Sequence, residues 1–114
     1  MRILVLLFIL ICYPLFALGQ TEEIVTLDTG SNSLEGSFLS PEGTAVPVVL
    51  IIAGSGPTDR NGNNTLMKNN CLKMLAEGFY ENGIATLRYD KRGIGGSALT
   101  AQQRTDTRFD DMVN

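Results

Sequence analysis

The sequence predicts an α/β fold with a mostly parallel sheet, and three stretches of the chain support this prediction. The apolar run at residues 47–52 has no alternating polar residues, which is typical of a strand buried on both faces. A helical pattern and a second strand follow, so that residues 46–89 have the order of a strand–helix–strand unit. Residues 23–39 have the pattern of an antiparallel hairpin.

Length and composition limit the chain to a single globular domain. Of its 114 residues, 44% are hydrophobic and 18% are charged, which does not fit a disordered chain. The formal net charge is -3 and the basic residues are scattered, so nucleic-acid binding has no electrostatic support. The chain has no histidine, which removes a histidine base and the commonest zinc sites. We expect no cofactor and no metal.

Residues 1–19 have the pattern of a cleaved signal peptide. Arg2 is followed by an unbroken apolar run at residues 3–11, and Ala17-Leu18-Gly19 supplies small residues near the cleavage position. The apolar stretch is shorter than the roughly 20 residues that a membrane-spanning helix needs. We therefore expect a secreted or periplasmic domain at residues 20–114, with no stable membrane anchor after signal cleavage.

Short strands at residues 23–28 and 34–39 form the predicted hairpin. The second strand alternates apolar and polar residues, as a strand with one face in water does. A turn rich in serine, glycine and asparagine joins the two strands. After a second turn at residues 40–43, the central apolar strand follows at about residues 46–52.

A helix is predicted at about residues 70–82. Its apolar stripe has the spacing i, i+3, i+4 and i+7 and consists of Leu72, Leu75, Ala76 and Phe79. Asn69 or Asn70 can cap the start of this helix, and Gly83 can end it in the left-handed conformation. Cys71 is the one cysteine that remains after signal cleavage, and we expect it to pack as a small apolar residue.

A second strand at residues 84–89 should run parallel to the central strand, because a helical crossover joins the two. A glycine-rich loop follows at residues 90–97, and polar residues 100–106 then lead to a capping-box pattern at Thr107 and Asp110. Because this pattern starts a helix close to the last residue, we expect residues 20–114 to be part of a longer domain.

The turn Gly54-Ser55-Gly56-Pro57 is the first candidate site. In open α/β sheets, ligands bind at the ends of strands, and a glycine turn can present backbone N–H groups to a developing oxyanion. The same residues can also form a plain tight turn, and the spacing leaves both interpretations open. Neither glycine loop matches a Walker phosphate loop or a dinucleotide fingerprint.

The polar loop that begins at Asp59 is predicted to be structural. Pairing between Asp59 and Arg60, with side-chain bonds to the backbone, would hold it. A calcium loop does not fit, because Asn64 and Asn70 stand where glycine and glutamate are needed.

The second glycine loop is also predicted to be structural. Asp90 and Arg92 are expected to bond each other and the loop backbone, and Gly54, Gly93 and Gly95 belong to the same structural set. Ser97 resembles a nucleophile, but Leu99 stands where G-x-S-x-G needs its second glycine. We therefore expect Ser97 to be structural.

Three segments, taken together, resemble the N-terminal third of an α/β-hydrolase. They are residues 51–62 (IIAGSGPTDRNG), 72–77 (LKMLAE) and 83–95 (GIATLRYDKRGIG). More narrowly, the chain is similar to secreted bacterial esterases of the serine aminopeptidase-type (S33-like) group. The resemblance implies the N-terminal part of an α/β-hydrolase fold, a hairpin plus a βαβ unit, that ends before the nucleophile elbow.

The resemblance also implies roles for residues of the first glycine turn. At the matching position, the backbone N–H of Ser55 would be one oxyanion-hole donor, with the N–H of Gly56 as the alternative. The nucleophilic serine, the acid and the histidine of the family lie downstream, and none is present in this chain. We expect the complete protein to hydrolyse carboxylic esters through an acyl-enzyme, and the 114-residue chain alone to be inactive.

Two alternatives remain open from the sequence. One is a serine aminopeptidase-like peptidase of the same fold, and the other is a non-catalytic secreted binding module. The expected partner is a small-molecule ester or a short peptide. In the sheet of the family, the strand matching residues 48–52 lies between two others, one of them missing here, so we also expect an exposed apolar edge.

Overall fold

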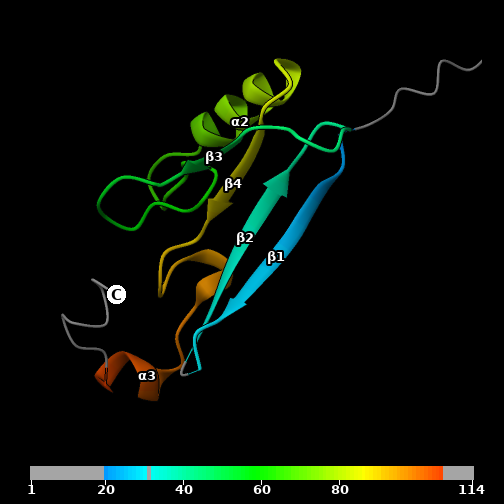
Figure 1. Ribbon diagram of the computed structural model, residues 1–114. Helices are drawn as coiled ribbons and strands as arrows, with labels where there is room; N and C mark the ends of the chain where they lie inside the picture. The colour runs from blue at the N-terminus through cyan, green and yellow to red at the C-terminus, as the bar shows by residue number, and fades with distance from the viewer. Residues whose placement is uncertain (1–19, 31, 107–114) are drawn as a thin grey trace, which may run out of the picture.

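A four-stranded mixed sheet with a helix on one face forms the centre of the computed structural model (Figure 1). The structure describes residues 20–30 and 32–106. Its strands are β1 (Glu22–Asp28), β2 (Ser33–Leu39), β3 (Val48–Ile51) and β4 (Ala85–Tyr89). Its helices are α2 (Cys71–Glu81), the short 3₁₀ turn η1 (Gly95–Ser97) and α3 (Ala101–Asp106).

The strands lie in the order β1-β2-β4-β3. β1 and β2 form the predicted antiparallel hairpin, and β2 pairs antiparallel with β4. β3 runs parallel to β4, with Val48 opposite Ala85 and Ile51 opposite Arg88. The predicted strand–helix–strand unit is therefore confirmed, and it brings the carboxyl ends of β3 and β4 to the same edge of the sheet.

Polar side chains and a glycine set the bounds of α2. Asn70 stands at the N-cap position and its side chain makes no cap hydrogen bond, whereas the side chain of the preceding Asn69 accepts the N–H of Cys71 at 3.0 Å. At the other end, Gly83 has a φ of 76° and its N–H donates to Tyr80 O. The N–H of Ile84 donates to Phe79 O, which completes a Schellman motif and confirms the predicted end of the helix.

The hydrophobic core lies between α2 and one face of the sheet. Leu39, Ile51 and Ala76 are buried at its centre, and partly buried apolar side chains surround them: Val49, Leu72, Phe79 and Tyr80. Leu75 belongs to the predicted stripe but is 48% exposed. Cys71 is exposed at the first turn of the helix, so the prediction that it packs as a small apolar residue is wrong.

The prediction that the central strand is buried on both faces is also wrong for the described residues. Val48, Leu50 and Ile52 are each more than half exposed, whereas Ile51 is buried beneath α2. The reason is that β3 lies at the edge of the described sheet and α2 covers only one face (Figure 1).

Residues 101–106 form α3, a helix that the sequence analysis did not predict. The sequence signal for this helix is the capping box that Thr100 and Gln103 form at its start. The N–H of Gln103 donates to Thr100 Oγ1 at 3.3 Å, and the N–H of Thr100 donates to Gln103 Oε1 at 2.8 Å. The capping box predicted at Thr107 and Asp110 lies outside the described residues.

The signal peptide predicted at residues 1–19 also lies outside the described residues. Within the part of the chain that is described, no helix has the length and apolar character needed to cross a membrane.

Candidate functional site

Two loops meet at the carboxyl ends of β3 and β4. We call residues 54–57 the first glycine loop and residues 90–97 the second glycine loop. They lie side by side because β3 and β4 are parallel neighbours. The ammonium group of Lys91, in the second loop, donates hydrogen bonds to the carbonyl oxygens of Gly54 and Gly56 in the first, the latter at 2.7 Å. The edge predicted to carry the site therefore does bring the two loops together.

The first glycine loop exposes backbone N–H groups. Residues 54–57 are all exposed, and neither the N–H of Ser55 nor that of Gly56 donates to another described residue. The carbonyl of Gly56 instead accepts from the N–H of Thr58 at 2.9 Å as well as from Lys91. The loop thus turns carbonyl oxygens toward the protein and leaves two N–H donors free, as binding a negatively charged oxygen requires.

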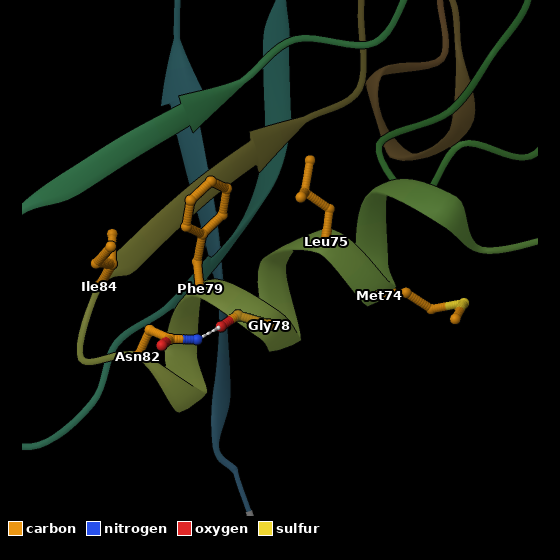
Figure 2. Close-up of a pocket in the computed structure, with 6 residues that line it drawn as sticks. All are labelled: Met74, Leu75, Gly78, Phe79, Asn82 and Ile84. Carbon is orange, nitrogen blue, oxygen red and sulfur yellow. Dashed lines mark hydrogen bonds between the residues drawn. The ribbon is translucent and has the colours of Figure 1, made fainter.

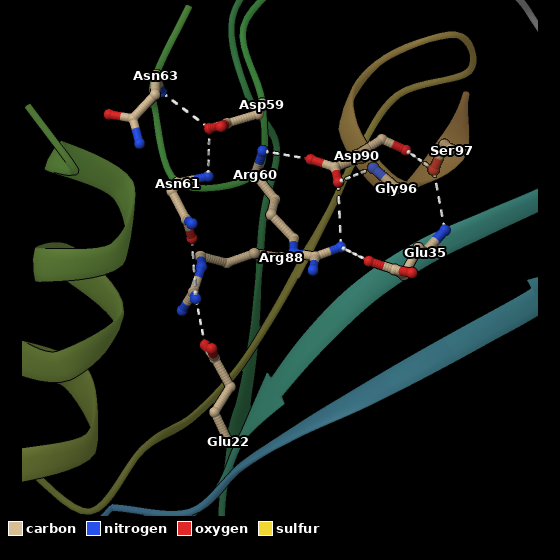
Figure 3. A network of polar contacts seen from close by, with 10 residues as sticks. All are labelled: Glu22, Glu35, Asp59, Arg60, Asn61, Asn63, Arg88, Asp90, Gly96 and Ser97. Carbon is tan, nitrogen blue, oxygen red and sulfur yellow. Dashed lines mark hydrogen bonds and ion pairs between the residues drawn. The ribbon is translucent and has the colours of Figure 1, made fainter. Parts of the chain in front are cut away.

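Asp90 organises the second glycine loop from a buried position (Figure 3). Asp90 is 3% exposed. One carboxylate oxygen accepts the backbone N–H of Arg60 at 2.7 Å. The other accepts Arg60 Nη1 at 3.0 Å and the N–H of Gly96 at 2.9 Å. A buried carboxylate is tolerated when it is paired and fully hydrogen-bonded, and Asp90 meets both conditions.

Arg60, rather than Arg92, is the ion-pair partner of Asp90, so the predicted Asp90–Arg92 pair is wrong. Arg60 Nη1 also pairs with Glu35 Oε1 at 2.7 Å, which ties β2 to the polar loop. Among the described residues, Arg92 has no ion pair. Arg60 lies 30 residues before Asp90 in the sequence. It reaches Asp90 because the polar loop folds back over the end of β4.

Asp59 bonds the backbone rather than Arg60. Its Oδ1 accepts the N–H groups of Asn61 and Asn63, each at 2.9 Å. The predicted side-chain-to-backbone bonds are therefore present, whereas the predicted pairing of Asp59 with Arg60 is wrong. The carboxylate of Asp59 turns back into its own loop, and this leaves the guanidinium of Arg60 to Asp90 and Glu35.

Ser97 is structural, as predicted. Ser97 is 1% exposed. Its hydroxyl donates to Asp90 O at 2.7 Å and accepts the N–H of Glu35 at 2.9 Å. A hydroxyl that is buried and bonded in this way joins β2 to the second glycine loop. It is not available to attack a substrate.

Gly95 is required by both its conformation and its surroundings. Its φ is 49°, in the left-handed region that favours glycine. A Cβ atom at this position would lie 2.5 Å from Asp90 Oδ2, which is already held by its donors. Gly93 has a φ of 82° in the same loop.

Arg88 is a residue that the sequence analysis missed. It is fully buried beneath the polar loop, where its Nη2 donates to the carboxylate of Glu22 and to Asn61 Oδ1 at 3.3 Å (Figure 3). Its Nε and Nη1 atoms have no partner among the described residues. The signal in the sequence was a single charge inside an apolar strand, which is rare unless the charge is paired. Arg88 links β1 and β4 to the polar loop.

An open groove of ≈ 540 Å³ lies along α2, and no residue of the two glycine loops lines it (Figure 2). It is lined by Met74, Leu75, Gly78, Phe79, Asn82 and Ile84. The amide of Asn82 is directed back to its own helix, where it donates to Gly78 O at 2.8 Å. Because no set of polar groups converges on this groove, we do not regard it as the reactive site.

Comparison with known proteins points to α/β-hydrolases. No protein-family model matches the chain. Over 66 residues it is 38% identical to Esterase EstD of Thermotoga maritima. The aligned segment covers 57% of this chain and 16% of the esterase. The chain therefore matches less than a fifth of that protein's length.

Two solved structures share the fold. A cold-adapted esterase from an Arctic intertidal metagenomic library aligns with a TM-score of 0.51 and 23% identity, over 68% of this chain and 30% of that one. The α/β-hydrolase GrgF of Penicillium sp. sh18 aligns with a TM-score of 0.52 and 26% identity, over 75% and 29%. These likenesses confirm the predicted fold class: the described sheet and helix correspond to part of an α/β-hydrolase fold.

Proposed function

We propose that this chain is the N-terminal part of a secreted serine hydrolase that cleaves carboxylic esters. The esterase relative and the two α/β-hydrolase neighbours support a hydrolase of this fold. The chain has no histidine and no serine in a G-x-S-x-G context, so residues 20–114 alone are inactive in this proposal. The nucleophilic serine, its histidine and the acid are supplied by the rest of the complete protein.

The observation that carries the proposal is the pair of N–H groups at the exposed residues Ser55 and Gly56, neither of which has a partner among the described residues. In ester hydrolysis, a serine oxygen attacks the acyl carbon while the serine proton passes to the histidine, and the carbonyl π electrons move onto the carbonyl oxygen. The N–H of Ser55 donates to that oxyanion, with Gly56 as the alternative donor. The alcohol then leaves with a proton from the histidine, and water hydrolyses the acyl-enzyme. One such donor is worth roughly 10²–10³ in rate.

An ester fits these loops better than a peptide with a free N-terminus. An aminopeptidase needs an acidic group to receive the substrate ammonium. Among the carboxylates near the glycine loops, Asp90 and Glu35 are paired with Arg60, and Asp59 Oδ1 accepts two backbone N–H groups of its own loop. Esterase activity is also what the names of the Thermotoga relative and the Arctic neighbour state for those proteins.

The proposal is tested with the complete protein, p-nitrophenyl acetate and a fluorophosphonate that labels activated serines. We expect turnover that the fluorophosphonate abolishes, and one phosphonylated serine that lies outside residues 20–114. Residues 20–114 alone should show neither turnover nor labelling.

Two outcomes would overturn this proposal. Faster turnover of aminoacyl p-nitroanilides than of esters would favour the peptidase. Absence of both turnover and labelling in a folded complete protein would favour the binding module.

A further inference from the structure

Lys91 connects the two glycine loops through hydrogen bonds that have no role in the reaction proposed above. Its side chain leaves the second loop two residues after the end of β4. Its ammonium group donates to two carbonyl oxygens of the first loop, those of Gly54 and Gly56. We call this pair of hydrogen bonds the Lys91 bridge.

The geometry of the peptide unit gives the Lys91 bridge a specific consequence. The C=O of Gly54 and the N–H of Ser55 belong to the same planar peptide group, and in a trans peptide they point in opposite directions. No cis peptide bond occurs among the described residues. Holding the carbonyl of Gly54 toward Lys91 therefore turns the N–H of Ser55 away from Lys91.

The second hydrogen bond of the bridge fixes the other side of Ser55. The carbonyl of Gly56 shares its peptide unit with the nitrogen of Pro57, which carries no hydrogen. The bridge thus holds the peptide unit that contains the Ser55 N–H, and it also holds the carbonyl of Gly56. It makes no bond to the Ser55 carbonyl, which shares its peptide unit with the Gly56 N–H. Between the two candidate donors, it selects Ser55.

Little else restrains the first glycine loop. Its four residues are exposed, two are glycines, and among the described residues its other loop hydrogen bond is that from the N–H of Thr58 to Gly56 O. Glycine loses more conformational freedom on ordering than other residues, so a loop of this composition needs specific bonds to keep one conformation. An ammonium on a carbonyl oxygen also polarises that peptide unit, which makes its N–H a stronger donor.

We propose that Lys91 is a positioning residue that orients and polarises the Ser55 N–H for the oxyanion. This inference rests on the proposed hydrolase function. Lys91 itself does not touch the substrate in this account. It acts by setting the direction of a donor that would otherwise sample several orientations.

The kinetic test replaces Lys91 in the complete protein. Lys91→Met keeps a flexible unbranched side chain, one atom shorter, but removes every donor, and should lower kcat for p-nitrophenyl acetate about 10- to 100-fold with little change in KM. Affinity for a trifluoromethyl ketone, whose adduct carries the oxyanion, should fall by a similar factor. Lys91→Arg can donate to both carbonyls and should restore most of the rate. Arg92→Met removes the neighbouring charge and should match the wild type.

A second readout measures the loop without relying on activity. With ¹⁵N-labelled serine, the amide order parameter of Ser55 should be that of a rigid backbone in the wild type and in Arg92→Met. In Lys91→Met it should fall below about 0.6. An unchanged order parameter in Lys91→Met would overturn the inference.

The two readouts separate this inference from the proposed function. A lower order parameter with an unchanged kcat would show that Lys91 orders the loop but does not serve catalysis, which overturns the positioning role. A wild-type protein that lacks serine-dependent ester hydrolysis would overturn the proposed function. The order parameter would then still report whether the Lys91 bridge orders the loop.

Discussion

Asp90 joins three parts of the chain through a single buried carboxylate. It accepts hydrogen bonds from the polar loop at Arg60 and from the second glycine loop at Gly96, while its own N–H donates to Glu35 O of β2. Burying a carboxylate costs several kcal/mol unless its hydrogen-bonding capacity is met, and the three donors here meet it. The position of Lys91, the next residue, depends on this arrangement.

Replacing Gly95 by alanine should disturb this arrangement directly. Gly95→Ala places a methyl group against Asp90 Oδ2 and forces alanine into the left-handed region. We expect the free energy of unfolding of the complete protein to fall by about 2–4 kcal/mol in denaturant titration. Gly54→Ala is the matched control, because nothing lies within 4 Å of its Cβ and its φ is not in that region. Equal losses in the two variants would contradict this role of Gly95.

The pairing of charges at the site could not be predicted from the sequence. Asp90 and Arg92 are close in sequence, as are Asp59 and Arg60, and proximity favoured both wrong pairs. The actual pair, Asp90 with Arg60, depends on how far the polar loop folds back over β4. The fully buried Arg88 was missed for the same reason, since its partner Glu22 lies on the far side of β2 in the strand order.

The strands and α2 were predictable because their signals are local. Apolar periodicity located α2, and Gly83 marked its end. The apolar run located β3, but periodicity alone could not show which of its faces α2 would cover. α3 was not predicted because its segment is polar, although Thr100 and Gln103 form a capping box at its start.

β3 is an edge strand of the described sheet and exposes apolar side chains. It pairs with β4 on one side only, and Leu50 is 52% exposed on the face that α2 does not cover. An apolar edge strand with free backbone groups is a site for pairing between chains.

Residues 20–114 expressed alone should therefore self-associate, and a charge on β3 should reduce this association. We expect Leu50→Lys to shift the protein toward a monomer in size-exclusion chromatography with light scattering. Leu66→Lys is the control, because Leu66 is 96% exposed but lies in a loop rather than on the edge strand. A wild-type monomer with a sharp thermal transition, or equal rescue by both variants, would contradict this interpretation.

At the scale of the whole molecule, the described sheet is one part of a larger arrangement in our proposal. The chain aligns with 30% and 29% of its two structural neighbours, and its described sheet has an unpaired edge at β3 and an uncovered face. What it contributes is a rigid edge from which the first glycine loop projects, held by Lys91. In our proposal, the reacting serine and histidine come from outside this chain.

The central claim is that the backbone N–H of Ser55, not its hydroxyl, stabilises the oxyanion. The most direct measurement is kcat for p-nitrophenyl acetate in the complete protein with Ser55→Pro and Ser55→Ala. Proline removes the N–H and should lower kcat by roughly 10²–10³, whereas alanine keeps it and should leave kcat within about twofold. A folded Ser55→Pro protein with the wild-type rate, or an equal loss in Ser55→Ala, would contradict the account.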